Sequence, residues 1–119
     1  MKECLRESDL LELTRESLAG SDQRLAAIPK DLCAPFYDEA RTVETELLAV
    51  YRVAALCAKR EDDLDRVSRW WGSMVEVCDI VLERLRDLSN ARPACGAEYY
   101  CDRVLDLRNK CHRLQTMHS

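Results

Sequence analysis

The sequence predicts an all-α protein, an up-and-down antiparallel bundle of four main helices with a short extra helical piece between the first and second. Three observations carry this prediction. Apolar residues make up 47% of the 119 residues and charged residues 34%, while glycine and proline contribute only three each. Apolar side chains recur at alternating intervals of three and four residues along most of the chain. Between the turns we find no run of alternating β-branched residues, so no sheet is expected.

The first helix is expected over residues 3–19, with Gly20 as its C-terminal stop. Its apolar stripe recurs every seven residues, at Cys4, Leu11, Leu18 and Leu25. Because Gly20 interrupts this stripe, Ser21 would begin the short extra piece, which ends before Pro29. Pro35 suits the first turn of the next helix, since a residue without an N–H costs nothing there.

The second long helix should continue to about Arg60. Its inward stripe is Phe36, Ala40, Val43, Leu47, Val50, Ala54 and Cys57. Acidic residues at positions 61–63 and 65 fit the start of the third helix, because negative charge is favoured at a helix N-terminus. The third stripe is the most regular: Leu64, Val67, Trp71, Met74, Cys78, Val81, Leu85 and Leu88.

The last helix should begin near Gly96 and continue almost to the end of the chain. Its inward stripe is Tyr100, Val104, Leu107, Cys111 and Leu114. Connections this short between long helices favour antiparallel neighbours. With no linker in the sequence, residues 1–119 should form one domain.

Charge and hydropathy bound the function. The 22 acidic and 18 basic residues are interleaved and leave a net charge of −4, so a nucleic-acid partner is not expected. The longest apolar run, residues 53–58, is too short to cross a membrane, and the charged N-terminus holds no signal peptide. We therefore expect a soluble, cytoplasmic protein.

Seven cysteines cannot all pair within one chain. Cys57, Cys78 and Cys111 fall on the apolar stripes and are interpreted as reduced core residues. Cys33 and Cys95 lie in connections and Cys4 near an end, where thiols are freer to oxidise. Reduced thiols are expected there too, with a disulfide or an intermolecular link as the alternative.

No cofactor is expected. A di-iron bundle needs Glu-x-x-His ligands, and neither His112 nor His118 follows a glutamate by three residues. A zinc site would need four tightly spaced ligands, and the five residues between Cys95 and Cys101 are awkward for chelation. The sequence therefore predicts no metal site.

Two enzyme classes remain as alternatives. The segment from Glu76 to Leu82, with Asp79 three residues after Glu76, resembles the second acidic motif of the all-α, magnesium-dependent nucleoside triphosphate pyrophosphohydrolases. Both acids, however, fall on the outer half of the third helix. The spacing of Arg113 and His118 matches the Arg and His of toxin-type α-bundle ribonucleases, in which they bind phosphate and assist proton transfer.

Adjacent aromatic residues, Trp70 and Trp71, mark the third helix. Successive helical residues differ by about 100°, so Trp71 takes the core and Trp70 lies at the edge of the stripe. Val77 extends this apolar edge, which either another helix or a second copy of the chain must cover. Trp70 and Val77 are therefore the candidate interface. The sequence favours a non-enzymatic protein that acts through protein–protein contacts, as an adaptor, a regulator or a homodimeric module.

Overall fold

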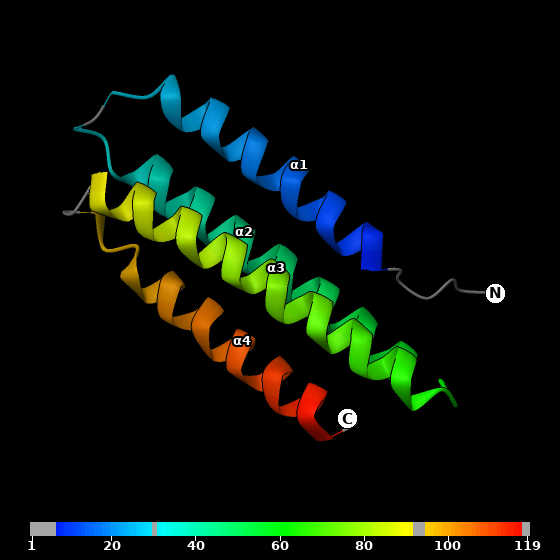
Figure 1. The fold of residues 1–119 in the computed structure, drawn as a ribbon. Helices are drawn as coiled ribbons and strands as arrows, with labels where there is room; N and C mark the ends of the chain where they lie inside the picture. The colour runs from blue at the N-terminus through cyan, green and yellow to red at the C-terminus, as the bar shows by residue number, and fades with distance from the viewer. Residues whose placement is uncertain (1–6, 30, 92–94, 118–119) are drawn as a thin grey trace.

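A computed structural model describes residues 7–29, 31–91 and 95–117 (Figure 1). Within these ranges the chain forms four α-helices and no strand: α1 (Glu7–Ala26), α2 (Ala34–Ala58), α3 (Leu64–Ala91) and α4 (Glu98–Met117). Figure 1 shows the helices lying lengthwise beside one another, in a body that measures 51 × 27 × 16 Å. The all-α class predicted from the sequence is confirmed.

Helix α1 continues through Gly20, so the prediction of a helix stop there and of a separate short piece beginning at Ser21 is wrong. A glycine inside a helix costs only about 0.5–1 kcal/mol relative to alanine. Contacts with α2 hold the helix on the far side of the glycine, because the Ser21 hydroxyl and the Arg24 guanidinium both donate to Glu39. The expected start at residue 3 lies outside the described residues.

The starts of the next two helices follow the sequence signals. Pro35 lies in the first turn of α2, as predicted, and α2 ends at Ala58, two residues before the expected Arg60. Asp63 caps α3: its Oδ1 accepts hydrogen bonds from the backbone N–H groups of Asp65 at 3.1 Å and Arg66 at 3.2 Å. The acidic cluster therefore satisfies N–H groups that the first turn of a helix leaves unpaired.

The core follows the predicted stripes of α2, α3 and α4 and centres on α3, which contacts the other three helices. The stripe predicted for the first helix is wrong in part, because Leu11 and Leu18 are only half-buried, whereas Leu10 and Leu25 are buried. Phe36, Met74, Cys78, Val104 and Cys111 are fully buried, at 0% exposure. Leu64 departs from the prediction, because the first residue of α3 is exposed, and Cys57, Leu88 and Leu114 are only half-buried. In the described part of the chain, no helix combines the length and apolar character that crossing a membrane requires.

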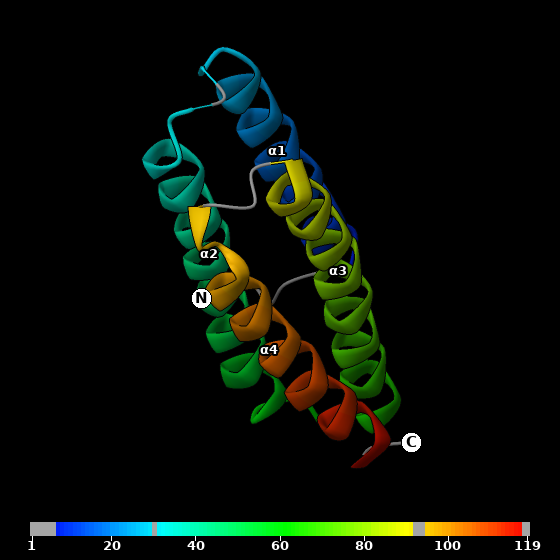
Figure 2. The same ribbon diagram turned by 90° about the vertical axis from the view of Figure 1, so that its left-hand side faces the viewer.

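Side-chain pairs join α1 to α2 and α3 to α4. They are Ser17 with Glu46, Arg24 with Glu39, Asp79 with Arg108, and Ser89 with Glu98. In both cases later residues of the first helix contact earlier residues of the second. Figure 2 shows α2 and α3 on opposite sides of the bundle with α4 in front, and α1 and α4 make no contact within the described residues.

A disulfide joins Cys33, just before α2, to Cys95, just before α4, with 4.8 Å between their Cα atoms. The expectation of reduced thiols at these two positions is therefore wrong. Both connections lie at the same end of the bundle, which brings together residues 62 positions apart. Gly96 follows with φ +68°, a left-handed conformation that glycine adopts without strain, and the chain then turns into α4. Cys4 lies outside the described residues.

Candidate functional site

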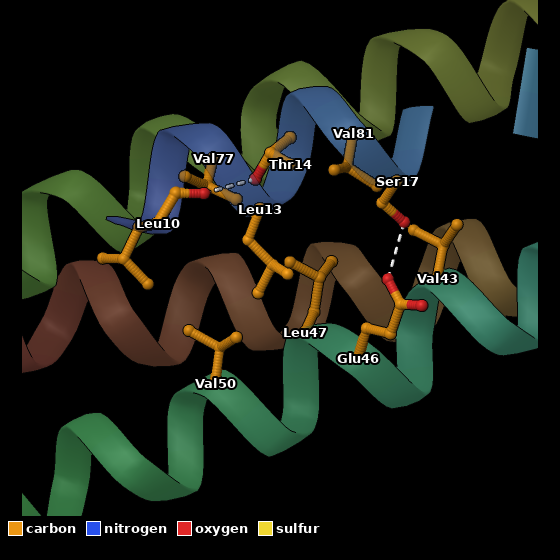
Figure 3. A pocket seen from close by; sticks show the side chains of 10 residues that line it. All are labelled: Leu10, Leu13, Thr14, Ser17, Val43, Glu46, Leu47, Val50, Val77 and Val81. Carbon is orange, nitrogen blue, oxygen red and sulfur yellow. Dashed lines mark hydrogen bonds between the residues drawn. The ribbon is translucent and has the colours of Figure 1, made fainter. Parts of the chain in front are cut away.

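An apolar slot opens along the line where α1 lies over α2 and α3 (Figure 3). We use the name α1–α2 seam for this slot together with the exposed Leu13 of α1 and Val53 of α2. The slot is lined by Leu10, Leu13, Thr14, Ser17, Val43, Glu46, Leu47, Val50, Val77 and Val81. With its open mouth it encloses about 290 Å³, and its closed part has room for about one water molecule. The packing of α1 thus leaves apolar surface reachable from solvent.

One end of the slot is polar. The Ser17 hydroxyl donates to Glu46 Oε2 at 2.6 Å, which Figure 3 draws as a dashed line between α1 and α2. A neighbouring polar hollow continues from this pair and adds Glu16, Gly20 and Arg24. Arg24 is engaged, because its guanidinium binds both carboxylate oxygens of Glu39. Glu16 and Glu46 therefore give this end of the seam an acidic character.

The Glu39 carboxylate has a shifted titration. The hydrogen bond from Arg24 is the largest cause and lowers the pKa of Glu39 below its ordinary value, partial burial opposes this, and the Ser21 hydroxyl adds to the lowering. Since Ser21 and Arg24 both belong to α1, this one carboxylate on α2 anchors the C-terminal half of α1.

Apolar side chains along the seam are also exposed. Leu13 on α1 is 38% exposed, and Val53 and Leu56 on α2 are 42% and 55% exposed. Val53 follows Val50 of the slot lining by three residues, so the two occupy neighbouring positions on α2, and Leu56 lies about 60° further round the helix. Val53 therefore continues the apolar lining of the slot toward the surface.

The candidate interface predicted from the sequence lies inside the molecule. Trp70 is 3% exposed and Val77 is 1% exposed. Val77 lines the slot together with Leu10 of α1, and the Arg66 guanidinium lies 5.4 Å from the centre of the Trp70 ring. The exposed apolar patch expected around these two residues is therefore not found, because α1 provides the cover over Val77. Large apolar side chains are exposed on all four helices, and those of α1 and α2 are Leu13, Val53 and Leu56.

A second groove between α2 and α4 holds an ion pair that the sequence analysis missed. Glu44 is 6% exposed, and its Oε1 accepts a hydrogen bond from Arg103 Nε at 2.9 Å. The sequence held a signal for this burial. Leu48, Tyr51 and Ala55 form a second apolar line on α2, and Glu44 lies on it, four residues before Leu48. The partner could not be read from the sequence, since it comes from another helix.

The residues that suggested an enzyme do not converge. Glu76 and Asp79 are both exposed, and Asp79 Oδ1 accepts a hydrogen bond from Arg108 at 3.1 Å. Arg113 is exposed, and His118 lies outside the described residues. Among the residues that the structure describes, no three His, Cys, Asp or Glu side chains gather closely enough to hold a metal ion.

The free thiols are enclosed by the core. Cys78 and Cys111 are fully buried, and burial raises the pKa of the Cys111 thiol to about 12 and that of Cys78 further. Burial also raises the pKa of Cys101. Thiols that stay protonated at neutral pH are poor nucleophiles, so these three side chains act as small apolar residues.

The candidate site is therefore the α1–α2 seam: apolar side chains from α1 and α2 with an acidic end. Comparison of the chain with known protein families, with curated proteins and with solved structures finds no match.

Proposed function

We propose that this chain is a non-enzymatic helical-bundle protein that acts through protein–protein contacts, and that the α1–α2 seam is the contact surface. The observation that carries the proposal is the exposure of Leu13, which lines an apolar slot, and of Val53, which follows Val50 of the slot lining by three residues. Apolar surface rimmed by polar residues is typical of protein interaction sites. The seam therefore replaces Trp70 and Val77, which were predicted from the sequence, as the candidate interface.

The arrangement proposed with this function is an up-and-down antiparallel bundle of one domain. Its support is the order of the contacts: Arg24 with Glu39 and Ser17 with Glu46 pair later residues of α1 with earlier ones of α2. The short connections between the helices favour the same arrangement.

Helix α1 is held in place by hydrogen bonds to α2 more than by apolar burial, and this suits a protein-binding role. Leu10 and Leu25 are the only large apolar side chains that α1 buries, within the residues whose burial is described. Its C-terminal half is held by the hydrogen bonds to Glu39, and near its middle the Ser17 hydroxyl binds Glu46. A helix held in this way can shift to admit a partner more easily than one buried on several faces.

The proposed compartment is the cytoplasm. Its support is that Cys57, Cys78, Cys101 and Cys111 are free thiols, three of them buried. A reducing compartment preserves such thiols. The Cys33–Cys95 disulfide favours the opposite environment, so its state in cells tests the proposal. Thiols trapped with an alkylating reagent at the moment of lysis measure that state, and a Cys33–Cys95 disulfide in most molecules would overturn the cytoplasmic proposal.

Site-specific photo-crosslinking in the native host tests the contact surface. A photoreactive amino acid at Val53 should give discrete adducts with a partner protein, because this side chain lies on the seam. Ile80 on α3 is the matched control, since both side chains are 42% exposed. An adduct of twice the chain mass would identify a second copy as the partner. Adducts equal from the two positions, or none from Val53, would overturn the proposed surface.

A further inference from the structure

We propose that the Cys33–Cys95 disulfide is a reversible redox switch, which the thiol glutathione opens and glutathione disulfide closes. In the oxidised chain the bond clamps the start of α2 to the start of α4. In the reduced chain this end of the bundle loosens, while the helices stay packed on α3. The switch is a device of the fold and does not rest on the proposed contact surface.

The disulfide lies where an external thiol can approach it. Cys33 and Cys95 are both half-buried, and the residues next to them, Leu32 and Gly96, are exposed. Disulfides that external thiols can reach are the labile and regulatory ones, whereas a bond enclosed by the core does not respond to the thiols around the protein.

The other described thiols of the chain are poorly suited to exchange with this bond. Cys78, Cys101 and Cys111 are buried, and burial raises the pKa of each thiol, although exchange requires the thiolate. Cys57 lies near the other end of α2, about 36 Å along the helix from Cys33. Among the described residues, exchange at this bond therefore needs a thiol from outside the molecule.

A tyrosine pair beside the disulfide holds the two helix starts together when the bond is open. The Tyr100 hydroxyl donates to the Tyr37 hydroxyl at 3.3 Å, and the ring centres are 5.0 Å apart. Tyr37 lies one helical turn after Cys33, because its N–H donates to the Cys33 carbonyl oxygen. The fold itself therefore keeps Cys33 near Cys95, so the bond can close again after reduction.

The remainder of the bundle does not depend on this end. Val104, Leu107 and Cys111 are buried further along α4, which packs against α3. Reduction breaks one covalent link and removes no side chain from the core. We therefore expect it to loosen residues 31–37 and 95–101 and to leave the bundle folded, because local opening costs less than global unfolding.

The exchange balances with glutathione as the external thiol. A glutathione thiolate attacks one sulfur of the bond and forms a mixed disulfide, and the other cysteine leaves as a thiolate that takes up a proton. A second glutathione thiolate attacks the glutathione sulfur of the mixed disulfide and releases the remaining cysteine, which is also protonated. Two glutathione molecules thus become one glutathione disulfide as Cys33 and Cys95 are reduced, and the reverse steps close the bond.

Redox buffers measure the switch on the full chain. Protein equilibrated at a series of ratios of glutathione to glutathione disulfide would be alkylated in denaturant, and mass spectrometry would count the free thiols. We expect Cys33 and Cys95 to open and close together, at the same ratio from either direction. Amide NMR shifts should change at residues 31–37 and 95–101 and stay constant in the middle of α3. A bond that excess glutathione leaves closed, or shifts that change throughout α3, would overturn the switch.

Two conservative variants test the tyrosine pair. Tyr37→Phe keeps the ring but removes the hydrogen bond, so the glutathione ratio at the midpoint should move about threefold toward easier opening. Tyr51→Phe is the matched control, because Tyr51 lies on the same helix but away from the disulfide. Equal shifts from both variants, or none from Tyr37→Phe, would overturn the role of the tyrosine pair.

Thiol trapping in the native host distinguishes a switch from a permanent bond. We expect the bond to be open in resting cells, closed after treatment with diamide, which oxidises glutathione, and open again after recovery. A bond that is closed in all three samples, or open in all three, would overturn the inference. Crosslinks from Val53 would still uphold the proposed function in either case.

Discussion

Helices α1 and α3 are both long and regular, but they are held in the molecule by different forces. Helix α3 buries ten apolar residues, including Trp70, Trp71 and Met74, and lies against each of the other three helices. Within its described side chains, α1 buries two large apolar residues, Leu10 and Leu25. Polar contacts to α2 and α3 supply much of the rest of its attachment.

This difference means that α3 determines the stability of the fold, whereas α1 determines how easily a partner can reach the core. Removing α3 from its neighbours would expose the whole core, so its helical state depends on global folding. Moving α1 breaks a few hydrogen bonds at Ser17, Ser21 and Arg24 and exposes a short apolar lining. We expect α1, which buries the fewest apolar side chains among the described residues, to have the lowest local stability, as is common for surfaces that bind partners.

The largest effect should come from the Cys33–Cys95 bond, which links the connection before α2 to the connection before α4. Closing a loop of 62 residues lowers the entropy of the unfolded chain and is worth about 4 kcal/mol. The double variant Cys33→Ser/Cys95→Ser should lose about this much unfolding free energy in urea. Reductant should destabilise the wild type to the same level and leave the double variant unchanged; a wild type insensitive to reductant would contradict this account.

Paired core truncations compare the two helices directly. Met74→Ala removes a side chain with 0% exposure from the middle of α3 and should cost about 3 kcal/mol, because it leaves a cavity with packed walls. Leu10→Ala should cost about 2 kcal/mol, the lower end of the range, since α1 can close over the adjacent slot.

Hydrogen exchange distinguishes the consequences of these two changes. Met74→Ala should accelerate exchange of the slowest amides in all four helices, while Leu10→Ala should accelerate exchange mainly in α1. Equal costs, with exchange accelerated throughout by both variants, would show that α1 is as integral to the core as α3.

Strengthening α1 should also be measurable. Gly20→Ala is expected to raise the unfolding free energy by about 0.5–1 kcal/mol, because alanine loses less backbone entropy in a helix. A Cβ added at Gly20 would lie 3.4 Å from Nη1 of Arg24, a flexible side chain that can move slightly. A loss of stability would mean that the added methyl group weakens the Arg24–Glu39 ion pair by more free energy than the gain in helix propensity supplies.

The smallest effect should be a pH dependence at Glu39. The pKa of this carboxyl is lowered in the folded state from its ordinary 4.5, chiefly by Arg24, so the unfolded chain takes up the proton at higher pH. The stabilisation is therefore complete above about pH 4.5 and is lost as the pH falls through the folded pKa. Unfolding free energies measured against pH should show Glu39→Gln less stable than wild type at pH 7, with the difference shrinking below pH 4.5. A difference constant with pH would contradict this assignment, and Arg24→Gln should reproduce the trend.

The periodic part of the fold could be predicted from the sequence. Stripes such as Phe36 to Ala54 on α2 identify buried faces, because three- and four-residue spacing places side chains on one side of a helix. Single residues that commonly end a helix were less informative. Gly20 looked like a stop, but its effect on the helix is small compared with the contacts that Ser21 and Arg24 make with another helix.

The candidate site could not be predicted from the sequence, because it depends on how the helices pack against one another. Trp70 and Val77 were predicted to lie on an extra apolar edge of α3, but both are as buried as Trp71. Whether α1 or another molecule covers that edge depends on how far α1 extends. Leu13 and Val53 are exposed on different helices, and their relation becomes visible only when α1 lies over the part of α2 that contains Val50. Likewise, Cys33 and Cys95 were recognised as connection residues, and only the fold brings those two connections to one end.

The disulfide also makes part of the chain a closed covalent ring that contains all of α2 and α3, with α1 and α4 attached as arms. The connection at residues 59–63, largely exposed, belongs to that ring. A protease that cuts there opens the ring without separating its products, which migrate together on a gel until a reductant is added. The molecule can therefore carry a break in its backbone at this turn and remain one covalent unit, and the same turn is a natural place for the new ends of a circularly permuted chain.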